Sequence, residues 1–243
     1  MAGRGQSPGG TQTLPRLGIE GLSRAVVEDI VREVVTSRFG AERLGGLNPL
    51  VVHPSARHMH VSREDLDVLF GPGYELTPDR PLYQEGNFAA KETVTLVGRR
   101  SRVIPNLRIL GPLRKQSQIE LAFTDAISLG FEDVPVRLSG DIAGTPGAYV
   151  IGPAGMVHLR EGVIRAAMHV HMNPAEADHY GVKQGDVMQL RIGGDAGVVF
   201  SRVHVRIDGN SRLNVHMDTD EANACALHLA REFELISEKG GKR

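Results

Sequence analysis

Two pairs of histidines occur in this chain in the same pattern, with one residue between the members of each pair. His58 and His60 lie in RHMHVSREDL, and His169 and His171 lie in MHVHMNPAEA. In an extended strand, residues two apart point to the same face and lie about 6 to 7 Å apart. Each pair could therefore hold one metal ion through two imidazole nitrogens.

A helix start follows each histidine pair directly. Ser62 and Asp65 have the spacing of a capping box. Asn173, Pro174 and Glu176 supply a cap, a preset first helical residue and a third-position carboxylate. Both pairs are thus predicted where a strand ends and a helix begins, and their likeness indicates an internal repeat.

Two ligands make a weak metal site, so each half of the repeat is expected to supply a third. Glu120 in RKQSQIELAFTDA and His216 in SRLNVHMDTDEA are the candidates, because each precedes a Thr-Asp segment. Nitrogen-rich sets with one carboxylate favour zinc, although cobalt, nickel and iron(II) accept the same ligand types. The predicted sites, related by an internal pseudo-twofold, are His58/His60/Glu120 and His169/His171/His216.

The alternative interpretation is that these imidazoles hold no metal. A single pair on a strand is usually just two exposed or hydrogen-bonded imidazoles, whereas two copies with matching third ligands favour metal binding. The remaining histidines have no partner at matching spacing and are interpreted as surface or core residues: His53, His158, His179, His204 and His228.

Basic residues precede Glu120 in NLRILGPLRKQSQIE. Read as a strand, the overlapping segment RKQSQIELAFTDA places on one face Arg114, Gln116, Gln118 and Glu120. A planar guanidinium group suits phosphate, and a cation beside two metal ions implies an anionic substrate. The alternative is a basic turn exposed to solvent.

The elements that must position these residues are mainly strands. Alternating segments bounded by turn residues predict strands at ETVTLVG, NLRILG, SQIELAF, AYVIG, GVVFSRVHVRI and SRLNVHM. Helical signals are few: SREDLDVLF, NPAEADHYG and DEANACALHLAREFEL. The predicted fold class is a β-rich α+β protein.

Composition limits the function classes. The 243 residues are 41% hydrophobic and carry 28 basic and 29 acidic side chains, so neither nucleic acid nor a membrane surface is indicated as a partner. The single cysteine, Cys225, excludes an internal disulfide and fits a reducing compartment. The sequence has neither a long apolar span nor a secretory signal pattern, which predicts a cytoplasmic location or one enclosed within the cytoplasm.

The N-terminal region differs from the body. Residues 1–16 are rich in Gly, Pro, Ser and Gln and are expected to be disordered. Residues 17–39 carry apolar residues at helical spacing, and a Gly-rich linker follows them. This amphipathic helix either packs on its own domain or docks on a partner protein. The predicted division starts with an N-terminal region at residues 1–46. Two β-barrel halves follow at 47–140 and 141–235, and chain segments of one half are able to cross into the barrel of the other. Residues 236–243 form a C-terminal tail.

Several motifs in order resemble the PduL-type phosphotransacylases, the phosphate propanoyltransferases of bacterial microcompartments. They are RHMHVSREDLDVLFGPGYELTP, NLRILGPLRKQSQIE, SGDIAGTPG, HVHMNPAEA and VHMDTDEANA, within about residues 50–230. The resemblance implies two β-barrel domains capped by short helices and a dinuclear zinc site. It also implies reversible transfer of an acyl group, in propanediol degradation, between coenzyme A and inorganic phosphate.

The resemblance assigns residues by motif position. It gives zinc binding to the two histidine sets above and phosphate binding to Arg114. It gives coenzyme A contacts to Ser55, Arg108, Ser139 and Asn223. One departure is Met168, which stands where the second motif commonly has arginine and puts one contact near the ligands in doubt.

The residues favour direct attack of phosphate on the acyl group, because no serine or cysteine with a matched base is evident. The expected partners are acyl-CoA, phosphate, microcompartment shell or cargo proteins through the 17–39 helix, and a second copy in a homodimer. The expected location is the microcompartment lumen. The competing classes are a dinuclear-metal hydrolase and a non-catalytic scaffold component.

Overall fold

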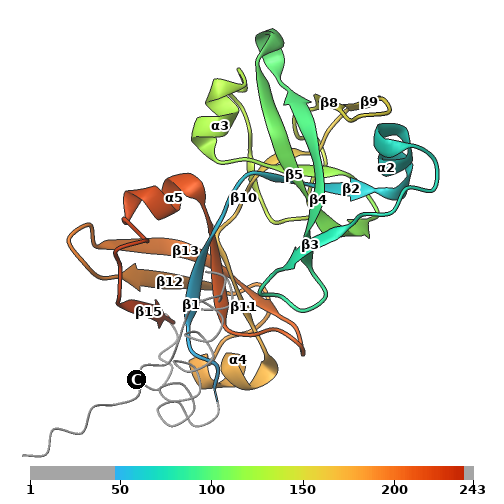
Figure 1. The fold of residues 1–243 in the computed structure, drawn as a ribbon. Helices are drawn as coiled ribbons and strands as arrows, with labels where there is room; N and C mark the ends of the chain where they lie inside the picture. The colour runs from blue at the N-terminus through green and yellow to red at the C-terminus, as the bar shows by residue number, and fades with distance from the viewer. Residues whose placement is uncertain (1–46, 238–243) are drawn as a thin grey trace, which may run out of the picture. The chain divides into compact units, whose positions relative to one another are not determined.

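The computed structural model describes residues 47–237. The predicted 17–39 helix lies outside these residues. The described part is β-rich, with two curled sheets and a few short helices (Figure 1). None of its helices has the length and hydropathy needed to cross a membrane.

One sheet has six strands in the order β1, β14, β11, β13, β12, β15. They are β1 (Val51–Ser55), β11 (His169–Met172), β12 (Val187–Ile192), β13 (Val198–Ile207), β14 (Asn214–Asp218) and β15 (Phe233–Ile236). The β1–β14 and β11–β13 pairs are parallel, and the others are antiparallel.

The other sheet has nine strands in the order β7, β10, β6, β2, β5, β4, β8, β9, with β3 paired to β4 beside this path. They are β2 (His58–Ser62), β3 (Pro78–Pro81), β4 (Phe88–Val97), β5 (Val103–Arg114), β6 (Gln118–Glu120), β7 (Val136–Arg137), β8 (Ala148–Ile151), β9 (Met156–Leu159) and β10 (Val163–Ala166).

The helices are α2 (Arg63–Phe70), α3 (Phe123–Ser128), α4 (Pro174–Tyr180) and α5 (Thr219–Ala224), together with a 3₁₀ turn at Arg99–Ser101. They follow β2, β6, β11 and β14 closely, so the predicted strand-to-helix junctions after both histidine pairs are confirmed. Asn173 and Glu176 form a complete capping box at α4. At α2, Ser62 caps the helix, but its own N–H donates to the Ser117 hydroxyl, 2.9 Å away.

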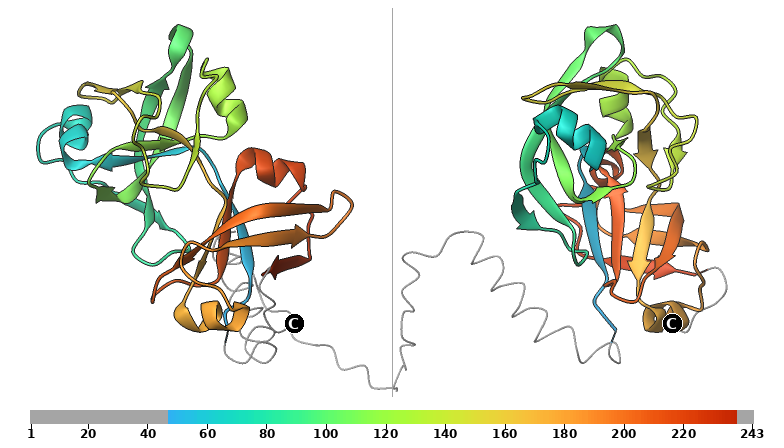
Figure 2. Two further views of the ribbon diagram at one scale, coloured as in Figure 1. Left: turned by 180° about the vertical axis from the view of Figure 1, so that it is seen from behind. Right: turned by 90° about the vertical axis from the view of Figure 1, so that its right-hand side faces the viewer.

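The chain crosses between the two sheets at the same point of each repeat. β1 belongs to the six-stranded sheet and β2 to the nine-stranded one, with only Ala56 and Arg57 between them. β10 belongs to the nine-stranded sheet and β11 to the six-stranded one, with only Ala167 and Met168 between them. Figures 1 and 2 show both crossings, in blue and in yellow. The six-stranded sheet thus takes β1 from the first predicted half of the sequence, and the nine-stranded sheet takes β8, β9 and β10 from the second.

Strand register brings the ligand candidates together in the same way in both sheets. β6 lies between β10 and β2, with Glu120 opposite His58. β14 lies between β1 and β11, with His216 opposite His169. Opposed residues in neighbouring strands project to the same face.

Alternation along these strands separates the ligand face from the core face. Met59, Ile119, Val170 and Val215 lie beside the candidate ligands in sequence and are fully buried in two hydrophobic clusters, one under each sheet. Truncation of such a side chain to alanine typically costs about 2 to 5 kcal/mol. The packed cores therefore determine which face presents the histidines.

One contact joins the ends of equivalent helices. The backbone N–H and the hydroxyl of Thr124, at the start of α3, both donate to the Asp220 carboxylate of α5, each over 2.8 Å. These two residues belong to the Thr-Asp segments that follow the third-ligand strands in the two halves. The contact therefore ties the two halves together beside the strands that carry those ligands.

Two predictions about elements were wrong. DEANACALHLAREFEL is not one helix: α5 ends at Ala224, Ala226 has a φ of 45°, and residues 233–236 form β15. Leu235 pairs with Leu190 and is buried, so pairing at the sheet edge outweighs local helix propensity. RKQSQIELAFTDA is not one strand, because β5 ends at Arg114, the chain turns, and β6 begins at Gln118.

Candidate functional site

The first histidine pair meets Glu120 within the nine-stranded sheet. His58 Nε2 lies 3.1 Å from His60 Nε2 and 3.5 Å from one carboxylate oxygen of Glu120. His60 Nε2 lies 3.6 Å from the other oxygen. All three residues are buried, and among residues 47–237 they are the only group of three whose possible ligand atoms lie within 4.8 Å of one another.

These separations fit a zinc ion. A tetrahedral zinc with bonds of about 2.0 to 2.2 Å holds its ligand atoms about 3.3 Å apart. His58 Nδ1 lies 2.8 Å from the Ala56 carbonyl oxygen, so it carries the hydrogen and leaves a lone pair on Nε2. Two nitrogen lone pairs 3.1 Å apart repel each other unless a proton or a metal ion lies between them.

The pKa values in this cluster diverge. Burial disfavours the charged form of His58, but the Glu120 carboxylate outweighs burial and raises its pKa. Burial, assisted by the charges of His58 and Arg114, lowers the pKa of His60 to about 4. The two histidines overcome the effect of burial on Glu120 and hold its pKa well below the usual value. The carboxylate is therefore ionised at neutral pH, and His60 keeps its lone pair.

The second histidine set also gathers, in the six-stranded sheet. The ring centroids of His169, His171 and His216 lie 4.9, 5.2 and 5.3 Å apart. His169 Nδ1 lies 2.8 Å from the Ala167 carbonyl oxygen, which repeats the contact between His58 and Ala56. His216 Nε2 lies 2.6 Å from the amide nitrogen of Asn214, a fully buried residue.

All three imidazoles of the second set are held neutral. Burial lowers the pKa of His169, and it lowers the pKa of His216 far more. Burial and the charges of His169 and Arg206 lower the pKa of His171 to about 3. Neutral imidazoles are the form that binds a metal ion. The donor chemistry of this set therefore also fits zinc.

Arg114 lies beside the first cluster, though not for the predicted reason. It ends β5, whereas Gln118 and Glu120 belong to β6. Its guanidinium group donates to the Ser139 hydroxyl over 2.8 Å, and that hydroxyl donates to Glu120 over 2.7 Å. Gln118 donates to both Ser139 and Glu120. Ser139 therefore links the arginine to the candidate carboxylate ligand.

Sequence reasoning missed Arg206, on β13. It is partly buried and lies in register with His171 on the neighbouring strand. Burial is the largest cause that lowers the pKa of His169, His171 and Arg114, and the positive charge of Arg206 adds to this effect at all three residues. Alternation in GVVFSRVHVRI puts Arg206 on the face of His204, but only the sheet order shows that this strand lies beside the second histidine pair.

The other residues that the resemblance connects with coenzyme A are spread over both sheets. Ser55 ends β1, opposite Asp218 at the start of α5, and Asn223 is exposed on α5. Arg108 lies opposite His58, and its guanidinium group donates to two carbonyl oxygens of β4. Ser55 and Asn223 thus flank the six-stranded sheet, whereas Arg108 is held within the nine-stranded one.

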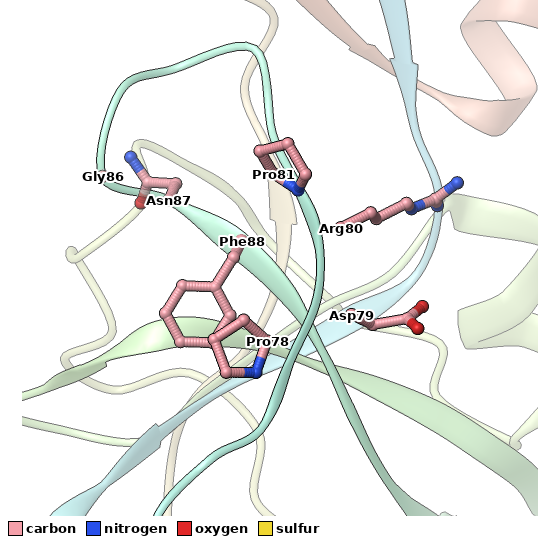
Figure 3. A pocket seen from close by; sticks show the side chains of 7 residues that line it. All are labelled: Pro78, Asp79, Arg80, Pro81, Gly86, Asn87 and Phe88. Carbon is pink, nitrogen blue, oxygen red and sulfur yellow. The ribbon is translucent and has the colours of Figure 1, made fainter. Parts of the chain in front are cut away.

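A surface hollow lies on the β3–β4 hairpin (Figure 3). It is lined by Pro78, Asp79, Arg80, Pro81, Gly86, Asn87 and Phe88. Phe88 packs over Gly111, where a Cβ atom would lie 2.2 Å from the ring. None of the lining residues is a candidate ligand, so this hollow is separate from the candidate metal centre.

Comparison with known proteins gives a consistent result. The family model described as phosphate propanoyltransferase matches residues 51–228. A phosphate propanoyltransferase of Planctopirus limnophila is 51% identical over 90% of this chain and 93% of its own length. Those of Thermotoga maritima and Salmonella typhimurium are 49% and 43% identical, over 74% and 76% of this chain and 85% and 87% of their own lengths. The chain therefore belongs to the phosphate propanoyltransferase family of acyltransferases.

Proposed function

We propose that the chain moves a short acyl group, propanoyl or acetyl, reversibly between coenzyme A and inorganic phosphate at a dinuclear zinc centre. The observation that carries this proposal is the zinc-like spacing of His58, His60 and Glu120 in a member of this family. The matching register of His169 and His216 supports a second ion in the other sheet.

We further propose that the sheets are two copies of one barrel-like half related by a pseudo-twofold, within residues 47–140 and 141–235. Support comes from the equivalent registers of Glu120 with His58 and of His216 with His169. Because β1 and β10 are exchanged between the halves, each third-ligand strand is held by both halves. The two metal sites then depend on one shared framework.

The proposed chemistry follows from the charges of the site. A bound zinc ion supplies Lewis acidity toward the phosphate and thioester oxygens. Arg114 binds phosphate and offsets its negative charge, and Ser139 holds this guanidinium group in place. A phosphate oxygen attacks the thioester carbonyl carbon, the carbon–sulfur bond breaks, and the proton lost by phosphate ends on the coenzyme A thiol. The products are acyl phosphate and free coenzyme A.

Direct attack is favoured over a covalent acyl-enzyme. Cys225 is buried, and burial raises the pKa of its thiol, which makes it a poor nucleophile. Incubation with acyl-CoA and labelled coenzyme A, without phosphate, separates the routes. Direct attack predicts no exchange of label, whereas exchange would establish an acyl-enzyme.

We propose coenzyme A contacts at Ser55, Arg108, Ser139 and Asn223. Ser55 ends β1 opposite Asp218, the residue that caps α5, and Asn223 lies on that helix. Ser139 differs because it already bonds the carboxylate of Glu120. Alanine variants of Ser55 and Asn223 should raise the KM for acyl-CoA and leave the KM for phosphate unchanged.

Metal analysis combined with a phosphate-dependence assay tests the main proposal. About two zinc ions per chain are expected, with acyl-CoA consumed only when phosphate is present. One ion or none would contradict the dinuclear centre. Release of free acid without phosphate would indicate a hydrolase, and absence of turnover with acetyl- and propanoyl-CoA would indicate a scaffold component.

We also propose that residues 17–39 dock the enzyme on shell or cargo proteins in a microcompartment lumen. The apolar residues at helical spacing in this segment support the proposal. Deletion of residues 1–46 should leave catalysis nearly intact and abolish co-assembly with shell proteins, whereas loss of folding would assign the segment to the core. Light scattering of the purified protein tests the proposed homodimer.

A further inference from the structure

We infer that Arg206 is a second phosphate-binding arginine, which acts with Arg114 from the opposite sheet to hold the phosphate between the two histidine clusters. The inference rests on the proposed function, because it takes phosphate to bind at that site. It assigns to β13 a part in substrate binding that the motif resemblance did not suggest.

The position of Arg206 follows from strand register. On β13 it lies directly opposite His171, and His204 lies opposite His169. Side chains in register on neighbouring strands project to the same face of a sheet. The buried Val205 between them faces the core. Arg206 therefore projects to the face that carries the second histidine cluster.

The charge of Arg206 agrees with the position that strand register gives it. Burial is the largest cause that lowers the pKa of Arg114, the Glu120 carboxylate opposes this effect, and the charge of Arg206 adds to it. The two arginines come from different sheets, and their positive charges act on one another.

Neither arginine forms a direct ion pair with a carboxylate of residues 47–237, although Glu120 attracts Arg114 from the far side of Ser139. Within these residues the Arg206 side chain forms no hydrogen bond or ion pair, and the Arg114 side chain bonds only the Ser139 hydroxyl. Arg165 shows the usual alternative, because it is paired with both Asp218 and Glu221. Two partly buried like charges without such partners are unfavourable unless an anion lies between them.

A tetrahedral oxyanion satisfies this arrangement. Each guanidinium group presents several N–H donors in a planar fork that suits phosphate oxygens. Binding from two sides would also restrict rotation of the phosphate and direct one oxygen toward the acyl carbon. The ligands of this pair are therefore inorganic phosphate and, in the reverse direction, the phosphoryl group of the acyl phosphate.

The test uses Arg206→Gln, Arg206→Lys and Arg114→Gln in the full chain loaded with zinc. Arg202→Gln is the matched control, since Arg202 is an exposed arginine on the same strand. For Arg206→Gln we expect the KM for phosphate to rise on the order of 10- to 100-fold, with the KM for acyl-CoA changed less than about threefold. The lysine variant should be intermediate because it keeps the charge and loses the fork.

A thermal shift with inorganic phosphate gives a readout independent of turnover. Phosphate should raise the Tm of the parent and the control, and this rise should be much smaller for Arg206→Gln. Parental phosphate dependence in both assays would overturn the inference. A selective rise in the KM for acyl-CoA would also overturn it, by assigning Arg206 to coenzyme A. If Arg114→Gln has no effect on phosphate either, the proposed phosphate site itself is wrong.

Discussion

The two histidine clusters occupy equivalent places in the two sheets and differ in charge. In each, the first histidine donates to a carbonyl two residues earlier and faces the third residue across an antiparallel strand pair. That third residue is Glu120 in the nine-stranded sheet and His216 in the six-stranded one. One side-chain difference in a repeated framework therefore separates a cluster that contains a carboxylate from a cluster of imidazoles alone.

The difference changes the behaviour of the neighbouring imidazoles. Glu120 raises the pKa of His58 against the effect of burial. Without a carboxylate, burial dominates, and the pKa of His171 falls to about 3. The first cluster can therefore hold a proton when no metal is bound, whereas the second offers only neutral lone pairs.

Removal of one ligand from either cluster should abolish transfer. For both His60→Ala and His171→Ala we expect activity to fall by at least about 1,000-fold, because the proposed mechanism uses both ions to bind phosphate and to polarise the thioester. Elemental analysis should show the loss of about one ion in each variant. His158→Ala, on the β8–β9 hairpin, is the control. Unfolding of either variant in circular dichroism would recast its cluster as structural.

Arg114→Lys should slow transfer roughly 100- to 1,000-fold, since lysine keeps the charge and loses the two-pronged contact. Steady-state kinetics should show weaker saturation by phosphate, with metal content and Tm close to the parent. The control is Arg137→Lys, at a partly exposed arginine that is paired with Asp141. Near-parental saturation by phosphate would remove Arg114 from the first cluster's function.

Ser139→Ala tests the hydrogen bonds that only the first cluster has. Loss of this hydroxyl removes one of two hydrogen bonds to Glu120 from outside the cluster and leaves Arg114 without its own, so zinc affinity at the first site should fall on the order of 10- to 100-fold, with the second site unchanged. Competition with a chelator measures both affinities. If metal binding is unaltered and the KM for acyl-CoA rises instead, Ser139 contacts coenzyme A and does not position the ligand.

His171 in the second cluster and His58 in the first should respond to acid in opposite ways in the metal-free protein. As pH falls below 6.5, the unfolded chain protonates His171 while the folded chain, with a pKa of about 3 there, does not. The free energy of unfolding should then fall by up to about 1.4 kcal/mol per pH unit from this residue. The raised pKa of His58 has the opposite effect on the free energy of unfolding. Its contribution stabilises the fold below pH 6.5 and is lost as pH rises through the folded-state pKa.

Urea unfolding from pH 8 to pH 5 measures these slopes. On acidification, the free energy of unfolding of His171→Asn should fall less than that of the parent, and the difference between the two slopes should correspond to uptake of about one proton. The free energy of unfolding of His58→Asn should fall more than that of the parent. Equal slopes for the two variants would contradict the assigned charge difference between the clusters.

The local sequence pattern was sufficient to predict the two histidine pairs and the helices that begin directly after them. Period-two alternation places His58 with His60 and His169 with His171, and the capping residues Ser62 and Asn173 mark where the strands must end. These signals depend on neighbours within a few residues of the chain. They therefore required no knowledge of the fold.

Only the tertiary structure decided which strands lie side by side. The exchange of β1 and β10, the strand β15 in a segment with helical propensity, and the place of Arg206 opposite His171 all depend on pairing between distant segments. Ser139 reaches Glu120 and Arg114 for the same reason. Alternation states which residues share a face of one strand, but burial of the whole sheet selects the neighbouring strand and its register.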